Sequence, residues 1–372
     1  MYERPVWAEI DLGAIAHNVR EIKNRVKTGA RFCAVVKANA YGHGVIPVAR
    51  TVLEAGADQL AVAILEEAVE LRRAGFTVPI LIIGYTPPEQ AVLVVDKDIS
   101  QTIFSFDVAE ALSGAAAAAG RKAKVHLKID TGMSRIGIRP EAAGDFAAAV
   151  AALPGIEIEG VFSHFATADE KDKSFTWQQF DRFKQALARI EAKGIHIPIR
   201  HIANSAATLE LPETHLDMVR PGIILYGLWP SEDVEKVVDL KPAMKLKAKV
   251  SYVKEMKANQ SISYGRTYFT RGDSRIATLP IGYADGWTRL LAGKASVMIR
   301  GQRAPLVGRI CMDQCMADIS RIPGVSAGEE ALLFGEPQLP VEEVAAHLGT
   351  INYEVVCMVG SRVPRQYHGG IS

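Results

Sequence analysis

The amino-acid sequence predicts an α/β protein with an N-terminal (β/α)8 barrel and a C-terminal, mostly β domain. Three observations lead to this fold class. The chain has 372 residues, which suits two domains better than one core. From Arg31 to about Tyr226, short apolar runs alternate with segments of helical spacing. Beyond about residue 242 the chain changes to short strand-like runs separated by Gly, Asn and Asp.

Eight short apolar runs are the predicted barrel strands, because eight strands alternating with helices fit a closed barrel better than an open doubly wound sheet. They are Cys33–Lys37, Gln59–Ala63, Pro79–Gly84, Gln101–Phe104, Val125–Asp130, Ile158–His164, Ile199–Asn204 and Met218–Gly222. The helix-length segments between them are Ile46–Glu54, Leu65–Arg73, Pro87–Val95, Val108–Ala119, Glu141–Ala151 and Phe175–Lys193.

A linker and a second domain follow the barrel. Charged residues between two prolines predict the linker near Ser231 to Pro242. The strand-like runs beyond it are Lys247–Glu255, Arg275–Leu279, Ser296–Ile299, Ala317–Ile319 and Ala331–Phe334, and only Val341–Leu348 is clearly helical. We therefore expect domains at residues 1–236 and 237–372. Val6 to Leu12 is another predicted strand, one helix ahead of the barrel.

Composition and charge argue against several classes of function. Hydrophobic residues make up 48% and charged residues 23%, and the formal net charge is +1. No broad basic field favours nucleic acid or an anionic membrane surface. Residues 1–12 lack the apolar core of a secretory signal, and no apolar run reaches membrane-spanning length, so we expect a cytoplasmic protein. The HExxH, P-loop and Rossmann motifs are missing.

The four cysteines are expected to be buried free thiols. Cys33, Cys311, Cys315 and Cys357 form no CxxC pair, and reduced thiols are the default in the cytoplasm. We therefore expect no metal. Zinc stays open as an alternative, although the second cysteine pair or the histidines that such a site needs are missing.

One lysine stands where the first barrel strand meets a turn with two glycines. Lys37 ends the apolar run and precedes Gly42 and Gly44. Active sites of (β/α)8 barrels lie at the carboxyl ends of their strands. Burial there favours a neutral amine, which is usable as a nucleophile or a base. A solvated lysine at a strand end is the alternative interpretation.

Other strand ends carry residues that belong to the same kind of site. After the fifth to eighth strands come cations, an imidazole and small polar turns, namely Arg135, His164, Asn204, Ser205, Arg220, Gly222 and Ile223. The last two loops of a barrel commonly hold phosphate, and the Ser205 hydroxyl with the amides of Gly222 and Ile223 offers neutral donors for it. Pyridoxal phosphate, with its aldehyde and its phosphate, explains a lysine opposite such a site.

Seven blocks of the sequence resemble the alanine racemases, the pyridoxal-phosphate enzymes that interconvert L- and D-alanine. In chain order they are Trp7–Leu12, Ala34–Gly44, Lys128–Gly137, His201–Ala206, Arg220–Gly227, Ser263–Gly265 and Gly308–Gln314. They span nearly the whole chain. The resemblance implies a homodimer with shared active sites, in which the strand at residues 6–12 can join the C-terminal domain. It also implies that D-alanine is made for the cell wall.

The resemblance implies a role for each reacting group. Lys37 bonds to the cofactor and then acts as one base, and Tyr264, lent by the partner subunit, is the second base. Arg220 stands at the ring nitrogen, where a fixed cation disfavours a second positive charge. Our hypothesis is that this cation holds the enzyme to racemisation. A chain from Tyr264 through His164 to Arg220 is expected to stabilise the phenolate and keep His164 neutral.

Further residues are assigned by the same resemblance. Tyr41 and Tyr353 reach the cofactor phosphate, and Arg135 binds the cofactor's phenolic oxygen and the substrate carboxylate. The amide of Met312, beside Cys311 and Asp313, also meets that carboxylate from the partner subunit. Lys128 is expected to be carbamylated, which turns a cation beside Arg135 into an anion. We expect His43 and His201 to be structural.

Rival functions differ from this hypothesis in identifiable residues. A pyridoxal-phosphate homeostasis protein shares the barrel and lysine but lacks the C-terminal domain with Tyr264 and Met312. A broad-spectrum or serine racemase of the same fold stays open. A zinc-assisted dehydratase or aldolase would need metal ligands such as Cys357 and His368. The sequence also departs from the family at Ser134, where Gly or Asn is common, and at Gly13, where Asp often stands.

Overall fold

The computed structural model describes residues 4–370, and it divides into two compact units. The first contains residues 15–40 and 45–241, and the second contains the rest of the described chain. The first unit is a barrel and the second is mostly β, which confirms the predicted fold class. No helix in this described part is long and apolar enough to cross a membrane.

The barrel is a parallel sheet with the strand order β8-β7-β6-β5-β4-β3-β2-β9. Its strands are β2 Arg31–Val35, β3 Gln59–Val62, β4 Ile80–Ile82, β5 Ser100–Ile103, β6 Ala123–Lys128, β7 Ile156–Phe162, β8 Ile199–His201 and β9 Met218–Val219. Backbone hydrogen bonds from Asp217 to Arg200 and from Arg220 to Ala203, both 3.0 Å long, join the β8 and β9 segments and close the barrel.

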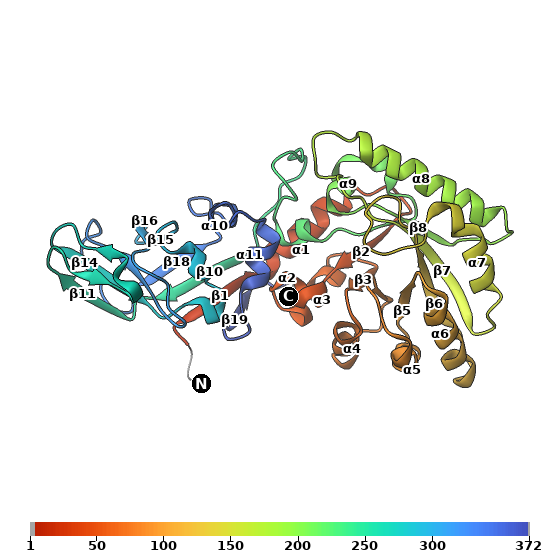
Figure 1. Ribbon diagram of the computed structural model, residues 1–372, viewed down its shortest axis with the longest axis horizontal. Helices are drawn as coiled ribbons and strands as arrows, with labels where there is room; N and C mark the ends of the chain where they lie inside the picture. Colours follow the sequence, from red (N-terminus) through yellow and green to blue (C-terminus); the bar gives the residue numbers. More distant parts are fainter. Residues whose placement is uncertain (1–3, 371–372) are drawn as a thin grey trace. The chain divides into compact units, whose positions relative to one another are not determined.

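Helices cover the outside of the barrel (Figure 1). Their bounds are α1 Leu12–Lys23, α3 Val45–Glu54, α4 Leu65–Arg73, α5 Ala91–Asp96, α6 Phe106–Ala118, α7 Ala143–Ala151, α8 Ser174–Glu191 and α9 Ser205–Glu210. The apolar faces of these helices pack inward; in α3, for example, Val45, Val48 and Val52 are buried. The alanine-rich segment ends α6, because Gly120 adopts φ +64° directly after it.

Several predicted strands are too long at their carboxyl ends. The strand β2 ends at Val35 instead of Lys37, β7 ends at Phe162 instead of His164, and β8 ends at His201 instead of Asn204. The ladder hydrogen bonds of these strands stop before the rim, and the chain then turns. The candidate site residues therefore lie on short segments just past the strands. Side chains there need not point alternately to opposite faces, as they do within a strand.

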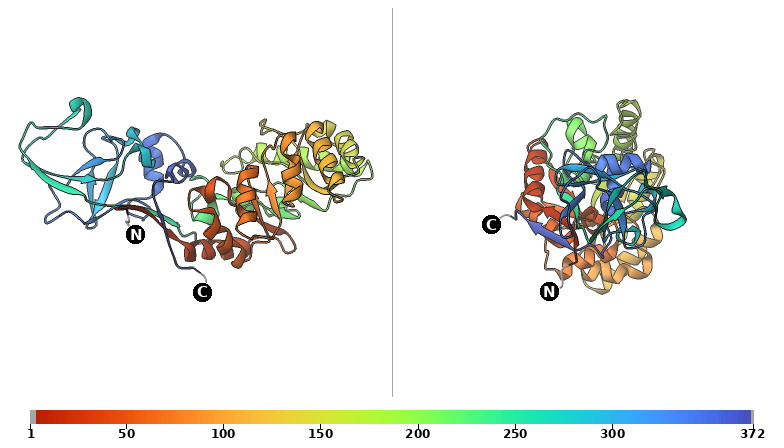
Figure 2. Two further views of the ribbon diagram at one scale, coloured as in Figure 1. Left: turned by 90° about the horizontal axis from the view of Figure 1, so that it is seen from below. Right: turned by 90° about the vertical axis from the view of Figure 1, so that its left-hand side faces the viewer.

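The second unit contains a six-stranded sheet, a three-stranded sheet and a short hairpin. The strands are β1 Val6–Asp11, β10 Met244–Lys249, β11 Tyr252–Met256, β12 Ser261–Ile262, β13 Tyr268–Phe269, β14 Ser274–Leu279, β15 Ser296–Ile299, β16 Gln302–Pro305, β17 Cys315–Asp318, β18 Glu330–Phe334 and β19 Arg365–His368. Strand β1 pairs with β10 and β19, and Figure 2 shows it in red among the strands of this unit.

Two sequence expectations for this unit are wrong. The run Lys247–Glu255 is not one strand, because the chain leaves the six-stranded sheet after Lys249 and enters the three-stranded sheet at Tyr252. A second helix, α11 Asn352–Met358, follows the predicted α10 Val341–Leu348. Its seven residues are too few for a clear helical period.

Candidate active site

Four cations converge on His164 at the carboxyl rim of the barrel. Burial lowers the pKa of His164 well below its usual range, and the charges of Arg220, Lys128, Arg135 and Lys37 lower it further. These residues follow or end β9, β6 and β2, so they are far apart in the sequence. The structure therefore brings together the predicted rim residues around one neutral imidazole.

Arg220 is the hub of this cluster. The guanidinium donates to His201 Nδ1 at 2.7 Å, to the Ser163 carbonyl oxygen at 2.9 Å and to His164 Nδ1 at 3.2 Å. Burial lowers the pKa of Arg220 to about 10, which leaves it protonated at neutral pH. Because arginine can only donate, both Nδ1 atoms must be acceptors. His164 and His201 are therefore neutral, with the proton on Nε2.

His201 is more than a structural histidine. We expected it to be structural, and it accepts one of the Arg220 hydrogen bonds. Burial lowers the pKa of His201 well below its usual range, and Arg220 adds to that effect. His43, by contrast, is buried and its Nδ1 lies 2.9 Å from the carbonyl oxygen of Tyr41, as a structural residue would.

One aromatic ring lies beneath the buried cations. Lys128 Nζ is 4.7 Å and Arg220 Cζ is 5.1 Å from the centre of the Phe162 ring. The His201 ring stacks on Phe162 with the ring centres 4.8 Å apart and the planes 5° from parallel. The negative face of an aromatic ring attracts cations, and this attraction grows when water is excluded. Phe162 thus offsets part of the cost of burying two cationic side chains.

Lys128 is an amine without a hydrogen-bond partner inside the described part of the chain. Its side chain is 3% exposed, and its Nζ atom has no partner there. Burial lowers the pKa of Lys128 well below its usual range, and the charges of Arg220 and Arg135 lower it further. A lowered pKa increases the share of the neutral amine, which is the form that reacts with electrophiles.

The segment that begins with Lys37 is a turn of left-handed helix. Ala38, Asn39 and Ala40 have φ of 52–54° and ψ of 48–52°, and Tyr41 has φ 52°. Each such residue costs roughly 1–2 kcal/mol when it is not glycine. Glu67 stabilises the turn by accepting a hydrogen bond of 2.6 Å from the Ala38 amide, and Asn39 accepts one of 2.8 Å from the Val45 amide.

The two glycines after this turn allow close packing. A Cβ atom on Gly42 would lie 2.3 Å from the carbonyl oxygen of Val356, and one on Gly44 would lie 1.9 Å from the Tyr367 hydroxyl. Both glycines also have positive φ. Ser134, a departure from the family, likewise has a positive φ of 55°, which explains why Gly or Asn is common there.

One of the predicted phosphate donors, the Gly222 amide, has a partner within the protein. Asn204 caps α9 by accepting from the Ala207 amide at 3.1 Å. The Gly222 amide donates to Ser205 Oγ at 2.8 Å, so Gly222 serves to orient the hydroxyl. The hydroxyl hydrogen of Ser205 then points away from that amide and is available to an incoming oxygen.

The second unit presents an exposed tyrosine and an exposed methionine. Tyr264 is 68% and Met312 is 53% exposed. Tyr264 and Cys311 line a hollow of about 320 Å³ in this unit, where Ser263 donates to the Arg309 carbonyl oxygen at 2.6 Å.

Other predicted residues of this unit have defined partners. Asp313 accepts a hydrogen bond of 2.6 Å from Arg362. The rings of Tyr41 and Tyr353 lie 6.1 Å apart, and burial raises the pKa of Tyr41. Lys37 belongs to the barrel unit, whereas Tyr41, Tyr264, Tyr353 and Met312 belong to the second unit.

Cysteine and metal expectations have mixed outcomes. No disulfide joins the four cysteines, but only Cys33 and Cys315 are buried; Cys311 is half-buried and Cys357 is exposed. Within residues 4–370, no group of three or more His, Cys, Asp and Glu side chains is arranged to hold a metal ion. Cys357 and His368 therefore belong to no zinc site in this range.

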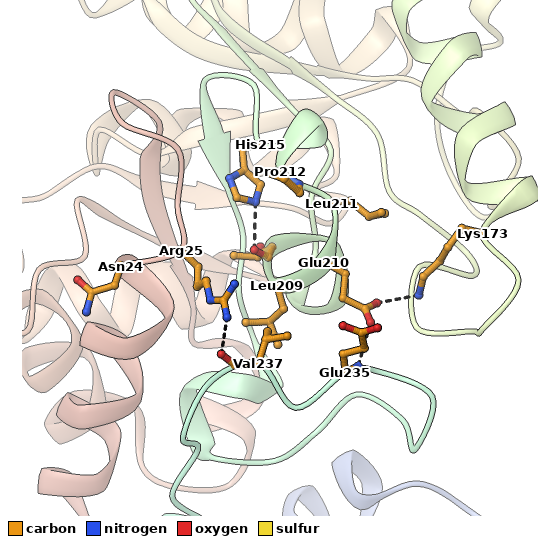
Figure 3. Close-up of a pocket in the computed structure, with 11 residues that line it drawn as sticks. Asn24, Arg25, Lys173, Leu209, Glu210, Leu211, Pro212, His215, Glu235 and Val237 are labelled. Carbon is orange, nitrogen blue, oxygen red and sulfur yellow. Dashed lines mark hydrogen bonds and ion pairs between the residues drawn. The ribbon is translucent and has the colours of Figure 1, made fainter.

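A larger hollow in the barrel unit is a packing gap under the linker. It has a volume of about 650 Å³ and its walls include Leu209 and Val237 (Figure 3). Its polar groups are occupied by one another, since Lys173 donates to Glu210 at 2.8 Å and Arg25 donates to the Val237 carbonyl oxygen at 2.6 Å. These contacts attach the linker to the barrel.

Three residues near the site escaped the sequence prediction. Glu67 holds the lysine turn, while His126 and Glu159 extend the network of His201 into the barrel. One signal was present in the sequence: His126 and Glu159 are polar residues inside the predicted strands Val125–Asp130 and Ile158–His164. Their partners are long-range, so the pattern alone did not reveal the network.

Together the fold and the rim define a (β/α)8-barrel protein with lysine, arginine and histidine side chains gathered at the carboxyl ends of its strands. Family models agree with this class. The model described as "Alanine racemase, N-terminal domain" matches residues 10–230, and that described as "Alanine racemase, C-terminal domain" matches residues 243–367.

Individual relatives match over their full length. An alanine racemase of Desulfovibrio desulfuricans is 57% identical, covering 98% of this chain and 99% of that protein. The structure of alanine racemase from Clostridium difficile has a TM-score of 0.95 and 44% identity, covering 99% of this chain and 97% of that one. That from Bacillus anthracis with bound L-Ala-P has a TM-score of 0.93 and 40% identity, covering 99% and 96%. The chain belongs to the alanine racemase family.

Strain in the lysine turn is open to a direct test. Ala38 is exposed, so Ala38→Gly removes a left-handed alanine and loses no core contact. We expect urea unfolding to show a gain in stability of about 1 kcal/mol. As a control, Ala149→Gly at an exposed right-handed position in α7 should lose about 1 kcal/mol. Equal losses in both variants would show that the turn holds no strain.

Proposed function

We propose that this chain interconverts L- and D-alanine with pyridoxal phosphate and uses one base on each face of the substrate carbon. The observation that carries the proposal is the convergence of Lys37 and three other cations on a neutral His164 at the barrel rim. Membership of the alanine racemase family supports alanine as the substrate.

The residues at the rim fit this cofactor. Lys37 would bond to its aldehyde carbon, and Arg220 would face its ring nitrogen. Ser205 and Ile223, with Tyr41 and Tyr353, would hold the phosphate through neutral donors. Asn204 would support this segment by capping α9, and the Gly222 amide by orienting the Ser205 hydroxyl. When bound, the cofactor supplies an electron-withdrawing ring that acidifies the Cα–H bond of the attached amino acid.

Arg220 would have two roles: its positive charge acts on the cofactor's ring nitrogen, and its hydrogen bond determines which nitrogen of His164 carries the proton. As a cation with a pKa of about 10, it disfavours a proton on a nearby ring nitrogen. Its hydrogen bond to His164 Nδ1 leaves the His164 proton on Nε2. That N–H is then a donor for a phenolate oxygen, and such a donor lowers the free energy of the ionised tyrosine.

Two side chains move the substrate proton in this proposal. Lys37 holds or releases it at Nζ on one face, and Tyr264 of a second copy of the chain does so at its phenolic oxygen on the other. The 68% exposure of Tyr264 supports its being lent to another subunit. The chain is then a homodimer in which residues 1–236 bind the cofactor and residues 237–372 complete the partner's site.

Substrate binding falls to two groups. The Arg135 guanidinium is a planar donor suited to a carboxylate. The backbone amide of Met312, on the segment with Cys311 and Asp313, would reach the same carboxylate from the second subunit. The ion pair between Asp313 and Arg362 supports a rigid segment there.

Lys128 would become an anion by carbamylation, which pairs it with Arg135. Its Nζ is buried without a hydrogen-bond partner in the described chain and has a lowered pKa, which supports this reaction with carbon dioxide. Intact mass of the chain measured at neutral pH is expected to show one added carbon dioxide, and Lys128→Met should lack it. An unmodified mass in bicarbonate buffer would contradict the assignment.

Cofactor attachment can be tested by trapping. The chain is mixed with pyridoxal phosphate, reduced with borohydride and digested. We expect the label on the peptide that contains Lys37, because the strained turn presents its amine at the rim. A label on another lysine, or none, would contradict the proposal. Racemisation rates for alanine, serine, arginine and lysine would then define the substrate.

Removal of the second base should affect the two directions unequally. Tyr264→Phe is expected to slow Cα proton exchange from one enantiomer by about 10²- to 10⁴-fold, while exchange from the other is affected much less. Single-turnover exchange in deuterium oxide measures both. Tyr252→Phe, another exposed tyrosine of the same unit at 59% exposure, is the control and should leave both rates unchanged. Equal losses from both enantiomers would refute the two-base assignment.

The proposed product indicates a biological role. D-Alanine is a precursor of the bacterial cell wall, and we place its synthesis in the cytoplasm. The absence of disulfides among the four cysteines is compatible with a reducing compartment.

A further inference from the structure

A chain of hydrogen bonds leads from Arg220 into the interior of the barrel. Arg220 donates to His201 Nδ1 at 2.7 Å. His201 Nε2 lies 2.8 Å from His126 Nδ1, and His126 Nε2 lies 3.0 Å from Glu159 Oε2. Ser100 donates to the same carboxylate oxygen at 2.6 Å. The chain thus connects the rim of β9 with side chains on β8, β6, β7 and β5.

The direction of every bond in this chain is determined by its two ends. Arginine can only donate, and an ionised carboxylate can only accept. His201 must therefore accept at Nδ1 and donate from Nε2, and His126 must do the same. Both imidazoles are then neutral and share one tautomer. Reversing either ring would leave two donors or two acceptors facing each other.

The barrel is shaped to hold this chain. His126 and His201 are at most 1% exposed. A Cβ atom on Gly160 would lie 2.4 Å from His126 Nδ1, so only glycine leaves room for the ring. The pairing of β6 with β7 also shifts register between Val125 and His126. Such irregularities redirect side chains, which is consistent with a built network.

Glu159 is the anionic end of the chain. Burial alone would raise its pKa, but the hydrogen bonds from His126 and Ser100 and the charge of Lys124 lower it. Arg220 itself forms no ion pair with a carboxylate inside residues 4–370; its closest polar partners are two imidazoles and backbone carbonyls. A buried cation in this position lacks a direct counter-charge.

We propose that Glu159 is the remote counter-charge of Arg220 and that His126 and His201 are the positioning residues that connect them. Glu159 orders the two tautomers, which keeps an acceptor at His201 Nδ1 for the guanidinium. The other terminal nitrogen of the guanidinium, Nη2, then keeps its hydrogen bond to His164 Nδ1. The inference deepens the proposed function, since it rests on the role given there to Arg220.

Removal of the carboxylate should disorder the tautomers. Glu159→Gln keeps the shape but offers His126 either an N–H or a C=O group, so only the Arg220 end of the chain still opposes the reversed direction. Ring-¹⁵N-histidine spectra of the full chain without cofactor measure the proton position, with His126 assigned by His126→Asn. In the natural chain we expect His126 and His201 to carry the proton on Nε2, as their hydrogen bonds require. In Glu159→Gln we expect His126 to populate both tautomers.

Glu157→Gln is the matched control, because Glu157 lies two residues away on β7 and is exposed. It removes the same charge and should leave both histidine signals unchanged. If Glu159→Gln does not fold, Glu159→Asp is measured instead and should keep Nε2–H on both rings. A proton on His126 Nδ1 in the natural chain would overturn the proposal, as would unchanged tautomers in Glu159→Gln or loss of Nε2–H in a folded Glu159→Asp.

The effect on catalysis gives a second readout. Glu159→Gln is expected to lower kcat for alanine about tenfold with KM unchanged, as happens when an outer partner of a positioned group is removed. Glu157→Gln should keep the natural kcat, and a kcat for Glu159→Gln equal to it would overturn the positioning role. The histidine spectra need no cofactor, so they test the chain of hydrogen bonds even if the borohydride label is not found on Lys37.

Discussion

The burial of Arg220 without a carboxylate partner among residues 4–370 is the constraint on which the rest of the site depends. A cation so placed is stable only if each hydrogen bond and each nearby charge is compatible with it. Its bonds to His164 and His201 make both rings acceptors, and its charge, added to burial, lowers the pKa of the Lys128 amine. The protonation states of the rim therefore follow from one side chain.

The barrel makes this arrangement possible by ending its strands early. Because β2, β7 and β8 stop before the rim, the proposed reacting residues of the barrel lie on turns. Turn residues can adopt φ and ψ angles outside the β region, which strand residues cannot. The left-handed turn after Lys37 is the clearest case. The hydrogen bond to Glu67 stabilises the strained turn, and the chain packs closely at the following Gly42 and Gly44. The strain lowers the stability of the protein but fixes the position of Lys37.

Much of the fold was predictable from local pattern. All eight barrel strands were found because parallel strands buried on both faces form apolar runs, such as Ala34 to Val36. What escaped prediction depends on long-range pairing: the role of His201, the chain through His126 to Glu159, and the bond from Gly222 to Ser205. Single polar residues within strands do not reveal their partners, which lie up to 75 positions away.

The most direct test of the account is a neutron structure of the deuterated chain. It locates the ring protons of His164 and His201 beside Arg220 without reference to activity. The account predicts deuterium on Nε2 of both rings and none on either Nδ1. Deuterium on Nδ1 of His164 or of His201 would mean that the guanidinium does not order the site, and the central claim would be wrong.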